Sequence, residues 1–181
     1  MNYQSLAIPE IGLITPRVFS DERGFFMESF NHREFEAAIG RPVQFVQDNH
    51  SRSCQGVLRG LHYQLKKPQG KLVRVTRGEV FDVAVDLRRS SPTFGQWLGV
   101  FLNEENQQML WIPPGFAHGF YVTSREADLQ YKCTEYYAPH DEHCIRWDDS
   151  NIAIEWPTLD RQPVLSNKDE LGLSLKVASH Y

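Results

Sequence analysis

The stretch 80–87 alternates between two kinds of side chain along its whole length. The large apolar positions are Phe81, Val83, Val85 and Leu87, and the positions between them are Asp82, Ala84 and Asp86. Successive side chains of a β-strand point to opposite faces of the sheet, so a period of two predicts a half-buried strand. A fold for this chain must therefore offer a sheet with an apolar face.

Five further segments are rich in β-branched and aromatic residues and are bounded by turn residues: 71–76, 95–102, 109–112, 119–123 and 129–136. The first joins the 80–87 strand across Arg77-Gly78-Glu79, a turn of hairpin length. Strands at this spacing are typical of an antiparallel sandwich or jelly roll. Strand-helix-strand alternation is missing, which disfavours a doubly wound nucleotide-binding fold.

Helix signals are confined to two short segments. Asn31 is a candidate N-cap for a helix over 31–39, which Gly40 and Pro42 end. Residues 166–169 form a capping-box pattern that opens a helical turn in a looser tail. No repeat or linker divides the chain, so we expect one all-β domain over 1–181 with a few short peripheral helices. Its core covers about 43–147, and the N-terminal strands and the tail pack on it.

Composition argues against several classes of partner. The 181 residues include 19 Lys and Arg against 23 Asp and Glu, a net charge of −4, and the basic residues are dispersed. This balance disfavours nucleic acid as a partner. No apolar run reaches the roughly 18 residues of a membrane helix, and no signal-peptide pattern stands at the start, so we expect a cytoplasmic protein with no membrane partner. The three widely spaced cysteines predict reduced thiols.

The common cofactor motifs are absent, and two histidine segments stand out instead. A Gly-x5-His segment ends at His62 and a Pro-x-Gly-x-x-His segment ends at His118, the spacings of the two motifs of the cupin jelly roll. Metal-binding cupins continue the first motif as His-x-His with a glutamate nearby, whereas Gln64 and the distant Glu79 stand here. Two imidazoles without a carboxylate fall short of a stable divalent site, so we predict no metal.

Seven segments in order carry a specific resemblance over nearly the whole chain: FSDERGFF (19–26), QDNHS (47–51), GVLRGLHYQ (56–64), QGKLVRV (69–75), IPPGFAHGF (112–120), YKCT (131–134) and LSNKD (165–169). With these motifs the chain resembles the dTDP-4-dehydrorhamnose 3,5-epimerase family. The resemblance implies a cupin-type double-stranded β-helix (jelly roll), a homodimer and no cofactor. It also implies epimerisation of dTDP-4-dehydro-6-deoxy-D-glucose at carbons 3 and 5, which gives dTDP-4-dehydro-L-rhamnose.

This chemistry has defined requirements. Inverting a carbon next to a ketone needs a base on one face, a cation or donor on the carbonyl oxygen and an acid on the other face. By resemblance, His62 is the base, Asp169 the carboxylate behind it, Lys71 the cation that stabilises the enolate and Tyr131 the acid. We also expect the nearby lysine to lower the pKa of the Tyr131 phenol.

Substrate contacts are likewise implied by the resemblance. Arg23, Arg59 and Lys168 are expected near the nucleotide diphosphate, because cationic side chains suit phosphate oxygens. The other expected contacts are Glu28, Gln47, Asp48, Asn49, Lys71, His118 and Glu142, with Phe19, Phe26 and Tyr137 as candidates to lie against the base. Arg23 and Phe26 belong to N-terminal strands that in the family reach toward the neighbouring subunit's site.

Strand parity constrains two of these positions without the resemblance. Lys71 shares parity with Val73 and Val75, so it faces inward, where an unpaired ammonium is costly and needs a functional reason. Arg59 and His62 have opposite parity and reach one cavity only if the strand bulges, which Gly60 permits.

Several alternatives stay open at this point. Asp169 is also explained as part of a helix cap, Tyr131 as a core residue and His62 as a structural histidine. At the level of function, the nearest rival is a related enzyme that inverts only one of the two carbons. A metal-dependent cupin and a sugar-nucleotide binding module without turnover are the two others.

Overall fold

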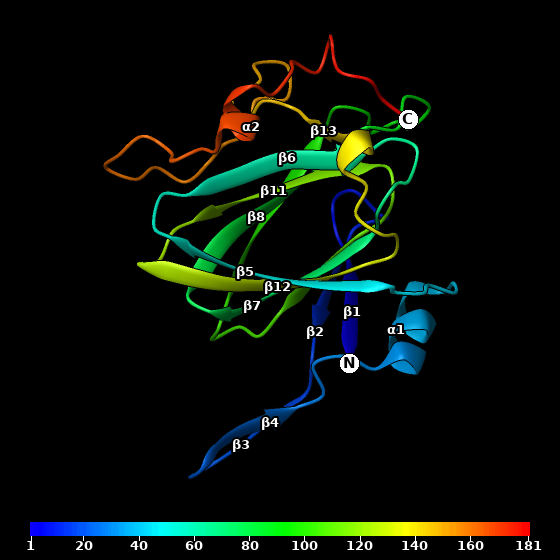
Figure 1. The fold of residues 1–181 in the computed structure, drawn as a ribbon. Helices are drawn as coiled ribbons and strands as arrows, with labels where there is room; N and C mark the ends of the chain where they lie inside the picture. The colour runs from blue at the N-terminus through cyan, green and yellow to red at the C-terminus, as the bar shows by residue number, and fades with distance from the viewer.

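Two antiparallel sheets face each other in the computed structural model, which describes residues 1–181 (Figure 1). The six-stranded sheet has the order β1 (Asn2–Ser5), β2 (Gly12–Thr15), β10 (Met109–Ile112), β7 (Lys71–Arg77), β12 (Glu126–Cys133) and β5 (Gln47–Cys54). The five-stranded sheet has the order β13 (Glu142–Cys144), β6 (Leu58–Gln64), β11 (Phe116–Val122), β8 (Glu79–Asp86) and β9 (Trp97–Asn103). The predicted all-β jelly roll is confirmed.

The turn between β7 and β8 changes sheets, so the predicted hairpin is wrong. β7 pairs with β10 and β12, whereas β8 pairs with β9 and β11. Gly78 makes this corner possible because its φ is +71° and an added Cβ would lie 2.0 Å from the Glu126 carbonyl oxygen. A short turn with a glycine fits either a hairpin or a corner between packed sheets, and sequence alone does not separate the two.

The strand over 80–87 exists as β8, but it is buried on both faces rather than half-buried. Its Ala84 packs in the core between the sheets, while Phe81, Val83 and Val85 belong to a second core with Ile152 and Leu175. The C-terminal segment after β13 covers the outer face of the five-stranded sheet (Figure 1). The acidic positions of β8 therefore lie toward the interior, which is where a functional carboxylate can be placed.

Both predicted helices form. In α1 (His32–Ile39), the Asn31 side chain accepts the Glu34 N–H at 3.2 Å, and Gly40 ends the helix with a φ of 71°. Phe35 of α1 packs on Trp111, with ring centroids 5.2 Å apart, so the helix covers the outer face of the six-stranded sheet. The other helical elements are η1 (Pro139–Asp141) and α2 (Asn167–Glu170). None of the helices combines the length and the apolar character needed to cross a lipid bilayer.

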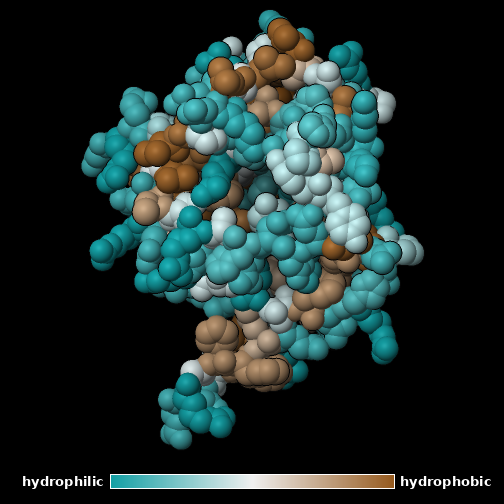
Figure 2. Space-filling model, viewed as in Figure 1, coloured by the Kyte–Doolittle hydropathy of each residue, from teal (hydrophilic) through white to brown (hydrophobic).

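A two-stranded hairpin of β3 (Val18–Asp21) and β4 (Gly24–Met27) projects from the body of the molecule (Figure 1). Its aromatic side chains Phe19, Phe25 and Phe26 are 50%, 59% and 69% exposed. Phe19 and Phe26 are register partners on one face of the hairpin, and Phe25 lies on the other face. An apolar area stands above a hydrophilic tip on this part of the molecule (Figure 2). At this tip Arg23 forms an ion pair with Asp21.

Candidate active site

A cavity of about 310 Å³ opens between the two sheets. The five-stranded sheet contributes Arg59, His62 and His118 to its lining, and the six-stranded sheet contributes Asn49, Lys71 and Tyr131. Groups from facing sheets can contact opposite sides of one bound molecule. The jelly roll therefore brings together most of the residues that the sequence singled out.

His62 and Asp169 form a close pair at the wall of this cavity. The Nε2 atom of His62 lies 2.6 Å from Oδ1 of Asp169, and this oxygen also accepts the Gly60 N–H at 3.2 Å. The Ser166 hydroxyl donates to the other carboxylate oxygen at 2.6 Å and accepts the Asp169 N–H at 3.3 Å. The helix-cap role of 166–169 and the pairing with His62 are thus both realised by one short helix.

The protonation states of this pair follow from their surroundings. Burial raises the pKa of Asp169, but the hydrogen bonds from His62 and Ser166 outweigh it and bring that pKa to about 2. Burial lowers the pKa of His62, and Asp169 offsets only part of this effect. A neutral His62 that donates Nε2–H to a charged Asp169 carries its free lone pair on Nδ1. It can accept a proton there.

A bulge in β6 brings Arg59 and His62 to the same cavity. His62 is paired with His118 and Arg59 with Phe120, so two residues of β6 stand opposite one residue of β11. Gly60 has a φ of +117°, and an added Cβ would lie 2.6 Å from the Gly119 Cα. The predicted bulge at Gly60 is confirmed.

Lys71 is inward-facing and only 8% exposed, as its parity predicts. Its ammonium has no hydrogen-bond or ion-pair partner within the protein. Burial lowers its pKa, and the charges of Cys133, Asp82 and Glu142 oppose this effect. An unpaired cation held in a cavity of low dielectric interacts strongly with any negative charge that develops there.

Tyr131 lies on the same sheet as Lys71, and its ring centroid is 6.5 Å from that of His118. Burial raises the pKa of Tyr131 to about 12. The expected lowering of this pKa by a nearby lysine is therefore wrong: burial of the phenol outweighs the charge of Arg59, which is the cation that lowers the pKa. The phenol is a protonated acid throughout the neutral range.

A second histidine and carboxylate pair stands beside the first. Nε2 of His118 is 3.0 Å from both carboxylate oxygens of Asp82, which is fully buried in β8. Both histidines of the cupin-type motifs are therefore hydrogen-bonded to their own carboxylate.

Three side chains meet at the mouth of the cavity. The Tyr137 hydroxyl donates to one oxygen of Glu142 at 2.9 Å, and the Lys168 ammonium donates to the other at 2.8 Å. Glu142 stands in β13, at the edge of the five-stranded sheet. These contacts join the segment after β12 to α2, the helix that carries Asp169.

Comparisons with known proteins decide the family. The model of the dTDP-4-dehydrorhamnose 3,5-epimerase family matches residues 5–176. The chain belongs to this family. A dTDP-4-dehydrorhamnose 3,5-epimerase of Pseudomonas aeruginosa is 61% identical over 172 residues, which are 95% of this chain and 94% of that protein. Its Shigella flexneri counterpart is 57% identical over 182 residues, with 100% and 99% covered.

A solved structure gives the same result at the level of the fold. The dTDP-6-deoxy-D-glucose-3,5-epimerase of Legionella pneumophila, in complex with dTDP-4-keto-L-rhamnose, is 53% identical and superposes with a TM-score of 0.96. The match covers 98% of this chain and 94% of that structure. It supports the cupin-type jelly roll for the whole chain.

Some residues that the family resemblance implied as contacts do not lie in this cavity. Gln47 and Asn49 line it, but Asp48 between them points to the other face of β5 and pairs with Lys132 at 3.0 Å. Strand alternation forbids three consecutive residues on one face. Glu28 lies outside the cavity, where it accepts a hydrogen bond from Asn31.

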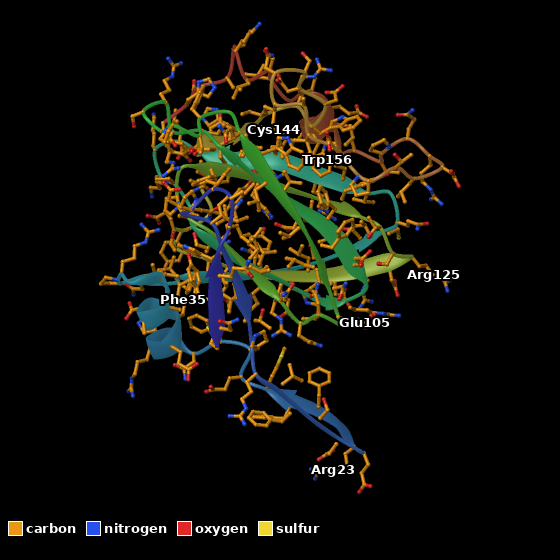
Figure 3. The ribbon with its side chains drawn as sticks, turned by 180° about the vertical axis from the view of Figure 1, so that it is seen from behind. Arg23, Phe35, Glu105, Arg125, Cys144 and Trp156 are labelled. Atoms are coloured by element: carbon orange, nitrogen blue, oxygen red, sulfur yellow. The ribbon has the colours of Figure 1, made fainter.

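Arg23, Phe19 and Phe26 are remote from the cavity of their own chain because they belong to the projecting hairpin. Arg23 stands at one end of the molecule and Cys144, the strand partner of His62, near the other (Figure 3). Tyr137, in contrast, lines the cavity, as do Arg59, Glu142 and Lys168.

Sequence reasoning missed several cavity residues: Ser51, Gln64, Gln69 and Phe120, together with Asp82 behind His118. Ser51 was accessible to prediction because it shares the parity of Gln47 and Asn49. Asp82 was harder to find, because the alternation in 80–87 places it on the solvent face of a half-buried strand. A carboxylate inside an otherwise apolar strand, near a histidine motif, is the signal that would have found it.

Proposed function

We propose that the chain is a cofactor-independent epimerase. It converts dTDP-4-dehydro-6-deoxy-D-glucose to dTDP-4-dehydro-L-rhamnose by inverting carbons 3 and 5. One observation carries the proposal: a histidine backed by a carboxylate on one sheet faces a phenol on the other, in a cavity with an unpaired lysine. The family membership and the names of the relatives support the same substrate.

In the first half of the reaction, Nδ1 of His62 takes the proton from the carbon beside the ketone. The charge of Asp169 stabilises the imidazolium that forms, at a hydrogen-bond distance of 2.6 Å. The electron pair of the broken C–H bond moves into the carbonyl group and gives an enolate. Lys71 stabilises the enolate oxygen, since its ammonium has no competing partner in the protein.

In the second half, Tyr131 returns a proton to the opposite face of the same carbon, and the carbonyl group re-forms. The raised pKa keeps its proton available until the enolate is present. His62 then loses its proton to solvent and Tyr131 regains one, so no redox group is consumed. The ketone at carbon 4 acidifies both neighbouring carbons, and one set of groups therefore serves both inversions.

For substrate binding, we propose that Arg59 and Lys168 meet the diphosphate and that Gln47, Asn49, His118 and Glu142 contact the substrate. Lys168 already pairs with Glu142, so phosphate oxygens would compete with this carboxylate.

We further propose a homodimer in which the β3–β4 hairpin reaches the neighbouring subunit. The exposed aromatic residues on this hairpin support that arrangement. A cytoplasmic location stays a prediction.

The test is proton NMR of chelator-treated protein with dTDP-4-dehydro-6-deoxy-D-glucose in heavy water. Loss of the hydrogen signals at carbons 3 and 5 is expected. Exchange at one carbon only would favour the mono-epimerase alternative, and exchange that requires added metal would favour a metal-dependent cupin. Binding of dTDP without any exchange would leave a binding module and overturn the proposal.

The division of roles is tested with Tyr131→Phe in the same experiment. This variant keeps the base and the lysine, so hydrogen exchange should survive better than inversion. His62→Ala should lose both. Equal loss of exchange in the two variants would contradict the assignment of base and acid.

A further inference from the structure

Cys144 stands directly beside the His62–Asp169 pair, although the proposed reaction does not use it. β13 and β6 are antiparallel, and Cys144 is the register partner of His62, so their side chains lie on the same face. The thiol donates a long hydrogen bond, 3.5 Å, to the Ile145 carbonyl oxygen. The thiol therefore has no strong partner that would keep it from another ligand.

Three potential metal ligands converge at this point. The Cys144 sulfur, a ring nitrogen of His62 and a carboxylate oxygen of Asp169 all lie within 4.8 Å of one another. They come from β13, β6 and α2, which the fold fixes relative to one another through backbone and side-chain hydrogen bonds. This donor set is distinct from the cupin-type pair of His62 and His118.

The donors fit one class of ion. Sulfur, nitrogen and oxygen ligands at about 2.0–2.3 Å are those of tetrahedral zinc, and three protein ligands leave a fourth position for water. A thiolate and a carboxylate together balance the charge of a divalent cation. The Gly60 N–H and the Ser166 hydroxyl already orient the Asp169 carboxylate, as outer-shell partners of metal ligands do.

We propose that His62, Cys144 and Asp169 form an inhibitory binding site for a thiophilic divalent cation, with zinc as the preferred ion. On binding, the Cys144 thiol releases its proton to solvent and the sulfur becomes a ligand. The ring of His62 moves slightly from Asp169 to admit the ion. The metal binds Nε2, the ring nitrogen that faces Asp169, and the ring proton moves to Nδ1, so the lone pair of the base is lost.

Direct binding is the first test, because it does not depend on the proposed function. Co²⁺ added to the chelator-treated full chain should give a thiolate-to-cobalt charge-transfer band in the near ultraviolet, and Zn²⁺ should displace it. Cys144→Ser should abolish the band. Cys54→Ser, which changes an exposed cysteine elsewhere in the chain, should keep it.

Inhibition is the second test and rests on the proposed function. Zn²⁺ should stop hydrogen exchange in the native protein and in Cys54→Ser, and a chelator should restore it. In Cys144→Ser, which should retain activity without metal, the inhibition constant for Zn²⁺ should rise more than about 100-fold, beyond the loss typical of an outer-shell partner.

Two results would overturn the proposal. One is a charge-transfer band that is absent from the native protein or unchanged in Cys144→Ser. The other is a cobalt band without zinc inhibition in a protein that shows metal-free exchange. The cobalt band can also behave as expected while neither the native protein nor any variant exchanges hydrogen at carbons 3 and 5. The metal site is then supported, and the proposed epimerase function is contradicted.

Discussion

The two histidines of the cavity are neighbours across two strands, but their carboxylate partners come from different parts of the fold. His62 and His118 are register partners on β6 and β11, and each uses Nε2 to contact its carboxylate. Asp82 belongs to β8, in the middle of the five-stranded sheet, and is fully buried. Asp169 comes from the C-terminal segment, in a four-residue helix packed on β6.

This difference separates two tasks. The His62 side chain is 22% exposed, so its ring can reach substrate and exchange a proton with solvent. His118 and Asp82 are 7% and 0% exposed, and their contact is enclosed by the core. A base needs access, whereas a group that fixes a sugar needs a rigid position. The comparison predicts that the first pair governs chemistry and the second governs binding and stability.

The largest expected effect is on proton abstraction. His62→Ala should lower the rate of hydrogen exchange at both carbons by about 10²–10⁴, the usual contribution of a general base. His118→Ala should mainly raise KM, because it removes the proposed contact to the sugar. Steady-state kinetics and NMR exchange on both variants measure this contrast. Equal losses of kcat would remove the distinction between the pairs.

The second effect concerns stability. Asp82→Ala leaves His118 without its hydrogen-bond partner inside the core and should lower the free energy of unfolding by about 2–3 kcal/mol, the upper part of the range for an unpaired buried polar group. Asp169→Ala leaves the Gly60 N–H and Ser166 hydroxyl unpaired at the edge of the fold and should cost about 1–3 kcal/mol. Asp148→Ala removes an exposed pair with Arg146 and serves as the control, at about 0–1 kcal/mol. Urea unfolding should give this order; a greater loss for Asp169→Ala would contradict it.

Lys71 faces both pairs from the opposite sheet and offers a third test. Lys71→Met removes the cation that we propose stabilises the enolate, and it should lower kcat by about 10²–10³. The same change replaces an unpaired buried ammonium with an apolar side chain and should raise the free energy of unfolding by about 1–3 kcal/mol. Steady-state kinetics should show the lower kcat, and urea unfolding should show the higher free energy of unfolding. A loss of activity with a loss of stability would show that Lys71 has a structural role.

The two pairs also show what the sequence can predict. Period and spacing predicted the strands between residues 71 and 136, the bulge at Gly60 and the inward direction of Lys71, because these depend on residues close in the chain. The burial of Asp82 depends on the tail that covers the outer face of β8, and the corner at Gly78 depends on which sheet the next strand joins. Such long-range packing leaves no local pattern. The positions of Asp169 and Tyr131 came from the family motifs, whereas local parity excludes Asp48 from the cavity.

The smallest expected effect is a shift in pH dependence. Burial lowers the pKa of Lys71, so kcat/KM should fall on the alkaline side below the ordinary lysine pKa of about 10.4. The negative charge of Asp82 favours the ammonium, and Asp82→Asn removes that charge. The lysine then loses its proton at lower pH, and the alkaline limb should move to lower pH. Asp169→Asn should move it less, because Asp82 is prominent among the charges that act on Lys71 and Asp169 is not. Lys71→Arg should remove the limb, since a guanidinium stays charged throughout this range. If the alkaline fall in kcat/KM persists in Lys71→Arg, it belongs to another group. The proposed effect of the Asp82 charge on Lys71 would then be contradicted.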